Sequence, residues 1–125
     1  MITIQDHHKN ILGQGGDDGS VVQGAINARV TCILYIDYDK GGEDGIDLTF
    51  DEYFKYLDSY YPLMYEDSET SVKRIEKKLN DSGKYRILMA LGDSGTKMRV
   101  NAQFINNSDS DGNAIITLAP MISSI

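Results

Sequence analysis

The chain has 125 residues, with 12 Lys and Arg against 19 Asp and Glu, a formal net charge of −7 and a pI near 4.6. The acidic balance argues against a nucleic-acid partner and against an anionic membrane surface, because both require a basic face. No apolar run approaches the ~20 residues of a membrane span. The first residues also lack the basic and long apolar segments of a signal peptide. We therefore expect a protein made, and kept, in a cytoplasm until it assembles.

A chain of this length buries the core of one domain without disulfides or a structural metal. Cys32 is its single cysteine and has no intrachain partner. Residues 1–19 end in a stretch, 13–19, whose glycines are costly to order. We predict that 1–19 form a flexible N-terminal arm lying on a neighbouring subunit, and that 20–125 form a single β-sandwich domain.

Runs of β-branched and aromatic residues predict an all-β, antiparallel fold. Two such stretches are each divided by a Gly/Asp turn, which is typical of β-hairpins: residues 30–50, divided at 39–45, and residues 83–104, divided at 92–95. Further strands are predicted at 20–26 and 114–119.

Alternation along these strands predicts which side chains are buried. In the strand at 30–38 one face is wholly apolar: Val30, Cys32, Leu34, Ile36 and Tyr38. The opposite face carries Ile33 and Tyr35, so this strand is either central or covered by other residues or another subunit. The predicted core consists of Leu34, Ile36, Leu48, Phe50, Ile87, Met89, Val100, Phe104 and Leu118.

Two segments of the sequence are compatible with either a helix or an extended strand. Apolar residues recur at helical spacing in residues 50–60, but the following Tyr60-Tyr61-Pro62 favours an extended chain. Residues 70–80 fit either a helix or a lysine-rich edge strand. A short helix in either segment stays open, and neither outcome changes the predicted sandwich.

Three motifs suggest chemistry and are better explained as turns or loops. Residues 92–95, Gly-Asp-Ser-Gly, copy the nucleophile signature of serine proteases, yet the only histidines, His7 and His8, lie in the predicted arm. These two histidines have no Cys or further His with which to complete a transition-metal site. The glycine-rich stretch 13–19 lacks the Lys-Ser/Thr of a phosphate loop.

Two acidic loops resemble calcium sites in part. Residues 107–112 match the first half of an EF-hand loop, but Leu118 occupies the position of the bidentate Glu; the run from Asp37 and Asp39 has Leu48 there. Solvated turns are favoured, while a weak divalent-ion site between the loops stays open. The eight tyrosines favour packing over sugar stacking, since tryptophan is absent. No catalytic, cofactor-binding or metal-binding residue is assigned, and we expect no enzyme and no cofactor.

Residues 33–41, followed by 43–50, resemble a hairpin motif of small virion structural proteins of tailed bacteriophages. Residues 82–87 are similar to a later block of the same group. The resemblance implies a virion subunit (capsid decoration, head–tail neck or tail component) whose partners are other virion proteins and copies of itself. The chain departs from the group in residues 51–61 and 71–80. The alternative is a carbohydrate-binding or calcium-dependent adhesive β-sandwich module.

Overall fold

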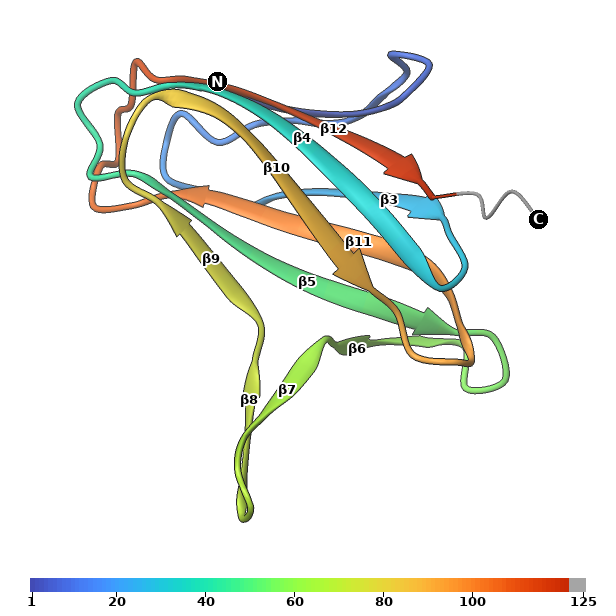
Figure 1. Cartoon of the computed structure of the whole chain (residues 1–125). Coiled ribbons are helices and arrows are strands. Elements are labelled where there is room, and N and C mark those ends of the chain that lie inside the picture. Colours follow the sequence, from blue (N-terminus) through green and yellow to red (C-terminus); the bar gives the residue numbers. More distant parts are fainter. Residues whose placement is uncertain (122–125) are drawn as a thin grey trace.

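Alternating apolar side chains bring the strong strands together as two layers, with a two-stranded ribbon projecting from one edge (Figure 1). The computed structural model describes residues 1–121. The fold is an all-β sandwich, and the strands pair antiparallel except for the parallel β1–β12 pair. No helix long and apolar enough to cross a bilayer occurs in residues 1–121.

The first sheet, sheet A, has the strand order β10-β4-β12-β1-β2. Its members are β1 (Ile2–Asp6), β2 (Ile11–Gly15), β4 (Thr31–Asp39), β10 (Gly83–Ala90) and β12 (Asn113–Pro120). The strand predicted at 30–38 is therefore β4, and it occupies an interior position of its sheet, between β10 and β12.

The second sheet, sheet B, has the order β3-β11-β5-β6, and β9 also pairs with β5. Its members are β3 (Val22–Asn27), β5 (Ile46–Phe54), β6 (Ser59–Pro62), β9 (Glu76–Leu79) and β11 (Gly95–Phe104). The projecting ribbon consists of β7 (Met64–Ser68) and β8 (Ser71–Arg74).

The core lies between the sheets and matches the sequence prediction closely. Eight of the nine predicted residues are buried, and the ninth, Ile87, is half-buried against the same cluster. Val30 is the exception on the predicted inner face of β4. It is 70% exposed and has a φ of 69°, because β4 begins only at Thr31.

The prediction of two hairpins is wrong. β4 and β5 lie in different sheets, and so do β10 and β11. β4 instead pairs with β10, and β5 pairs with β11. The turns at 40–45 and 92–94 therefore cross from one layer to the other, which lets consecutive apolar faces meet across the core.

Residues 1–19 are not the predicted flexible arm. They form β1 and β2, and Ile2 and Ile4 are fully buried. β1 pairs with β12 along its whole length, so this segment belongs to the core of its own subunit. The glycine-rich stretch supplies β2 and the turn after it, where Gly15, Gly16 and Gly19 have positive φ.

The helical alternative for residues 50–60 and 70–80 is also wrong. The first segment contains the end of β5, a turn and the start of β6, while the second contains β8 and β9. The tyrosines favour extended structure, and pairing with β5 holds β6 and β9 extended. The predicted domain also included residues 122–125, which lie outside the described residues.

Candidate interaction surface

The ribbon begins and ends at the outer edge of sheet B. β6 pairs with the second half of β5, and β9 pairs with its first half. Between them the chain leaves the sheet at Leu63 and returns at Ile75. The Leu63 N–H donates to the Phe50 carbonyl at 2.9 Å, and the Ile75 N–H donates to the Leu63 carbonyl at 2.8 Å. Leu63 is buried and Ile75 packs against the core, so the ribbon has a fixed base.

A buried carboxylate also holds the base. The Asp51 side chain is 5% exposed and accepts hydrogen bonds from three residues. Arg74 Nη2, at the end of β8, lies 2.7 Å from Asp51 Oδ1. Arg99 Nε and Asn101 Nδ2 lie 3.0 and 2.8 Å from Oδ2. Because Asp51 sits on β5, these charge-assisted bonds tie the ribbon to the sheet.

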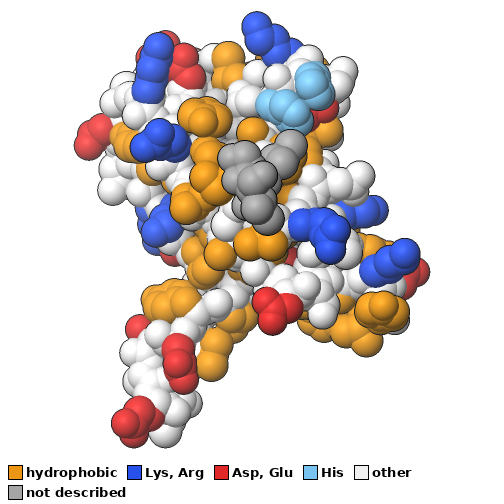
Figure 2. Space-filling model, turned by 45° about the vertical axis from the view of Figure 1, so that its right-hand side comes forward, with side chains coloured by type: hydrophobic (Ala, Val, Ile, Leu, Met, Phe, Trp, Pro, Cys, Tyr) orange, Lys and Arg blue, Asp and Glu red, His pale blue; other side chains and the backbone are white. Residues whose placement is uncertain are grey.

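The ribbon itself has almost no packing within the chain. Every residue from Met64 to Arg74 is exposed except Ser71. One face carries Met64 and Val72, while Glu66, Asp67 and Glu69 make the tip acidic (Figure 2). A two-stranded ribbon alone in water is marginally stable at best, so this element is suited to packing against something else.

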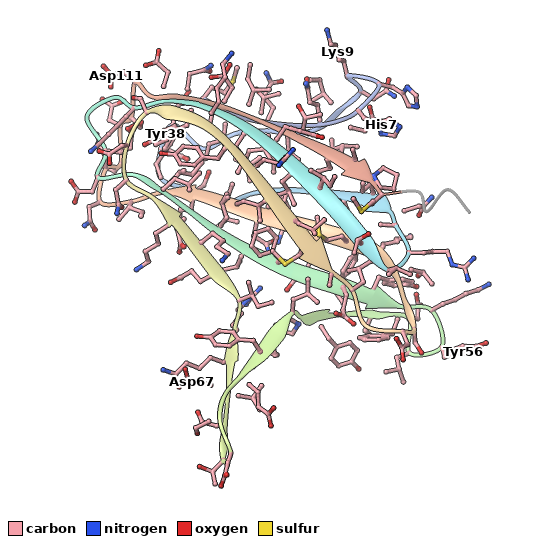
Figure 3. The ribbon with its side chains drawn as sticks, in the orientation of Figure 1. His7, Lys9, Tyr38, Tyr56, Asp67 and Asp111 are labelled. Carbon is pink, nitrogen blue, oxygen red and sulfur yellow. The ribbon has the colours of Figure 1, made fainter. Side chains whose placement is uncertain are left out.

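Exposed apolar side chains concentrate around this edge. Among the described residues, fourteen large hydrophobic side chains are exposed, and six of them lie between residues 56 and 72. Tyr56 is 94% exposed at the turn between β5 and β6 (Figure 3). The six are Tyr56, Leu57, Tyr61, Met64, Tyr65 and Val72. Exposed apolar side chains are a feature of interaction sites, so residues 56–74 are the candidate surface.

The outer face of sheet A is a second exposed apolar area. Tyr35, Leu88 and Ile115 lie on it, and each is exposed. The segment 51–80 does not cover it, because that segment pairs at the edge of sheet B. Lys84 and Arg86 lie on the same outer face of β10 as Leu88, at the free edge of the sheet. The described residues form no ion pair with either cation.

The two predicted acidic loops meet at one end of the sandwich, where Tyr38 and Asp111 lie in Figure 3. The Gly42 N–H donates to Asp111 Oδ1 at 2.9 Å. Glu43 is buried, and its carboxylate accepts from the Gly41 N–H at 2.8 Å and from Ser110 Oγ at 2.8 Å. Protein donors thus bind the oxygens of Glu43. In residues 1–121 no group of three or more His, Cys, Asp or Glu is arranged to hold a metal ion.

Two buried groups near the ends of β4 have raised pKa values. Burial, with the nearby Glu43 carboxylate as a lesser cause, raises the pKa of the Tyr38 hydroxyl, which has no hydrogen-bond partner in the described chain. Burial raises the pKa of the Cys32 thiol to about 12. The thiolate is the reactive form, so Cys32 is a small buried hydrophobe, as its strand position predicts.

No histidine side chain is hydrogen-bonded to the Gly-Asp-Ser-Gly turn in residues 1–121. His7 and His8 lie at the β1–β2 turn, while residues 92–95 connect β10 and β11 and lie against Glu52. The Gly92 N–H donates weakly to Glu52 Oε2 at 3.4 Å. Glu52 is 7% exposed, and burial raises its pKa. The turn thus closes over a buried carboxyl group and lacks the partners of a triad.

Two tyrosines of sheet B, Tyr53 and Tyr60, are each covered by a cation. Lys97 Nζ lies 4.8 Å from the ring centroid of Tyr53, and the Arg99 guanidinium lies 4.1 Å from that of Tyr60. Each contact occupies a ring face that a sugar would need for stacking. An open hollow of about 570 Å³ at residues 13–23 is lined mainly by glycine and small polar residues.

No family model matches the chain, and no curated protein sequence matches it. Among solved structures, the chain is similar to "Family 16 Carbohydrate Binding Module-2", at 14% sequence identity and a TM-score of 0.44. The alignment covers 85% of this chain and 73% of that chain.

Sequence reasoning missed the features that stand out here. It assigned no structure to residues 64–69, left residues 70–80 ambiguous, and assigned no role to Asp51. One signal was available: the acidic run at 66–69 between Tyr65 and Val72 is typical of a turn between two short strands. The contact of Asp51 with Arg74 and Arg99 joins residues 23 and 48 positions apart, and no local pattern indicates it.

Proposed function

We propose that this chain is a structural subunit of a bacteriophage particle, present in several copies and acting by protein–protein assembly. The carrying observation is the exposed apolar edge and ribbon of residues 56–74, which the rest of the described chain leaves uncovered. Assembly buries such a surface, and its apolar and aromatic composition suits an interface core. The resemblance of residues 33–50 to phage virion proteins is the reason for proposing a phage particle as the assembly.

The proposal places the chain in the virion after synthesis in the host cytoplasm. Its position as a capsid decoration, neck or tail component follows from the same resemblance. The role is structural, not catalytic. The site supporting it consists of apolar side chains and strand edges, whose chemistry is packing and hydrogen bonding.

Purified particles of the phage that encodes this chain provide the test. We expect mass spectrometry to find the chain at several copies per particle, and antibody labelling to place it on one particle component. Absence of the chain from particles purified to constant composition would overturn the proposal. The antibody control is a particle lacking the gene, if such a particle assembles.

The second candidate is a carbohydrate-binding or calcium-dependent adhesive module. The exposed tyrosines Tyr56, Tyr61 and Tyr65 favour it, since their rings are accessible. A glycan array read with and without calcium tests this candidate. Binding that is lost in Tyr56→Ala or Tyr61→Ala, with the melting temperature unchanged, would place it first.

A further inference from the structure

We propose that the β7–β8 ribbon of one copy adds to the free β10 edge of a second copy, so that strand pairing links the subunits. The inference rests on the proposed assembly function and names its partner and contact surfaces. It concerns the ribbon residues 64–74 and the β10 residues 83–90.

The ribbon offers unpaired backbone. Within residues 1–121, β7 pairs only with β8, so each strand has one edge of free N–H and C=O groups. Adding a strand to an exposed edge satisfies such groups and supplies main-chain hydrogen bonds. The ribbon projects away from its own sandwich (Figure 1), so it is placed to meet an edge of another molecule.

The β10 edge is the best receiver among the described strands. It has eight residues and pairs only with β4. On the opposite side of the sandwich β2 lies against β3, where a Cβ at Gly13 would meet the Gln23 carbonyl, which leaves no room for another strand. The free side of β6 has only four residues and ends in Pro62, which has no N–H.

Charge favours this pairing. The described residues form no ion pair with Glu66 or Glu69 on the ribbon, nor with Lys84 or Arg86 on β10. Copies with a net charge of −7 repel one another, so a basic edge facing the acidic β7 strand and its turn orients the approach. Lysine on an edge strand also opposes pairing with uncharged strands, and an acidic strand removes that obstacle.

Apolar side chains on the ribbon and on β10 also suit pairing between the two elements. Met64, Glu66 and Val72 share one ribbon face with Arg74. The Arg74 guanidinium is paired with Asp51 of its own sheet. Leu88, which is 60% exposed, shares the outer face of β10 with the two cations. Pairing along β10 sets an apolar and charged ribbon face beside an apolar and oppositely charged strand face, as cross-strand neighbours require.

Charge reversal tests the inference. The variants are Lys84→Glu with Arg86→Glu, and Glu66→Lys with Glu69→Lys, measured by sedimentation equilibrium of the full chain. We expect each pair to weaken self-association roughly tenfold or more, since like charges then face each other. The four changes together restore opposite charges and should restore association. So should an equimolar mixture of the two variants, which retains one native ribbon and one native edge.

The matched control is Lys9→Glu with Lys55→Glu. Both lysines lie in turns at the end of the sandwich opposite Lys84, and we expect this variant to associate like the natural chain. Circular dichroism and melting temperature confirm that every variant is folded. A natural chain that stays monomeric, or two variants that associate normally, would overturn the inference. So would a fourfold variant that stays as weak as the pairs.

The outcomes separate this inference from the proposed function. If the chain is found in particles but its self-association does not depend on the four charges, the virion role stands and this interface is wrong. A ribbon that binds another virion protein and not β10 likewise removes the interface and leaves the virion role. If the chain is absent from particles but still self-associates through these charges, only the virion role is wrong.

Discussion

Asp51 shows how one side chain joins the sandwich to its projecting element. Its carboxylate is nearly buried on the outer face of β5 because Arg74 and Arg99 lie over it. Asp51 lies on the outer face of β5, while its neighbour Phe50 faces the core and is fully buried. Burial in this case comes from long cationic side chains and not from the core.

Phe104 tests the core at the scale of one residue. It is 2% exposed at the end of β11. We expect Phe104→Ala to lower the free energy of unfolding by about 3–5 kcal/mol, because a buried phenylalanine leaves a cavity. Urea unfolding measures this. Tyr56→Ala is the control, since Tyr56 is almost fully exposed and its loss should cost within about 0.5 kcal/mol. Equal costs would contradict the assigned burial.

Glu52 predicts a pH dependence of stability. Burial raises its pKa above the ordinary value of a glutamate. The folded state therefore holds this proton more tightly than the unfolded chain, and the contribution of Glu52 to stability falls as pH rises through its raised pKa.

We expect Glu52→Gln to stabilise the fold at pH 7, because glutamine removes the cost of ionising a buried carboxyl group. The gain should shrink below the ordinary glutamate pKa, where both states are protonated. Thermal unfolding from pH 3 to pH 8 measures it. Asp81→Asn, an exposed site, is the control. A variant less stable than the natural chain at pH 7 would show that ionised Glu52 is stabilising.

At the scale of elements, the ribbon is an addition to the sandwich and not part of its core. Its strands contribute no residue to the buried cluster, while Leu63 and Ile75 at its base do pack there. The chain enters and leaves it through one pair of backbone hydrogen-bonded residues. This predicts that the ribbon is removable.

We expect the fold to survive when residues 65–73 are replaced by Asn-Gly. Met64 and Arg74 face each other in the ladder, and Asn-Gly closes a two-residue hairpin between paired residues. Arg74 remains and keeps its bond to Asp51. The melting temperature should stay within a few degrees, while self-association is lost. Unfolding of this variant would show that the ribbon stabilises the sandwich.

At the scale of the whole molecule, one end of the sandwich is closed by hydrogen bonds between loops that are far apart in the sequence. The loops at 40–45 and 105–112 are joined there through Glu43, Ser110 and Asp111, and the amino terminus pairs with Asp17 at 2.8 Å. These partners are all protein groups, so we expect the acidic loops to keep their structure without an added ion.

We expect EDTA to leave the melting temperature unchanged, and millimolar calcium to raise it by no more than the scatter between repeats. A ligand that binds only the folded state raises the melting temperature, so a rise of several degrees would reveal a site in these loops. Asp109→Asn with Asp111→Asn would then show whether these carboxylates bind it. Magnesium at the same ionic strength is the control.

The sequence by itself determined which side chains of β4, β5 and β11 face the core. Strand alternation has a period of two, so the inner faces of β4, β5 and β11 follow from the apolar pattern alone. Leu34, Phe50 and Val100 lie where the pattern predicts, and the all-β class follows from the same runs. The loops and turns at 40–45, 92–94 and 106–112 are also local, because Gly, Asp and Asn specify them.

Only the tertiary structure decided which strands pair. The apolar face of a strand is buried equally well whether the next strand in the chain pairs with it in the same sheet or packs opposite it in the other sheet. Alternation therefore did not distinguish a hairpin from a crossing between layers. Ile2 and Ile4 enter the core because β12, more than a hundred residues away, supplies the edge with which β1 pairs. Asp51 and Arg74 meet for the same reason: their contact depends on where the chain returns to β5, which no local pattern encodes.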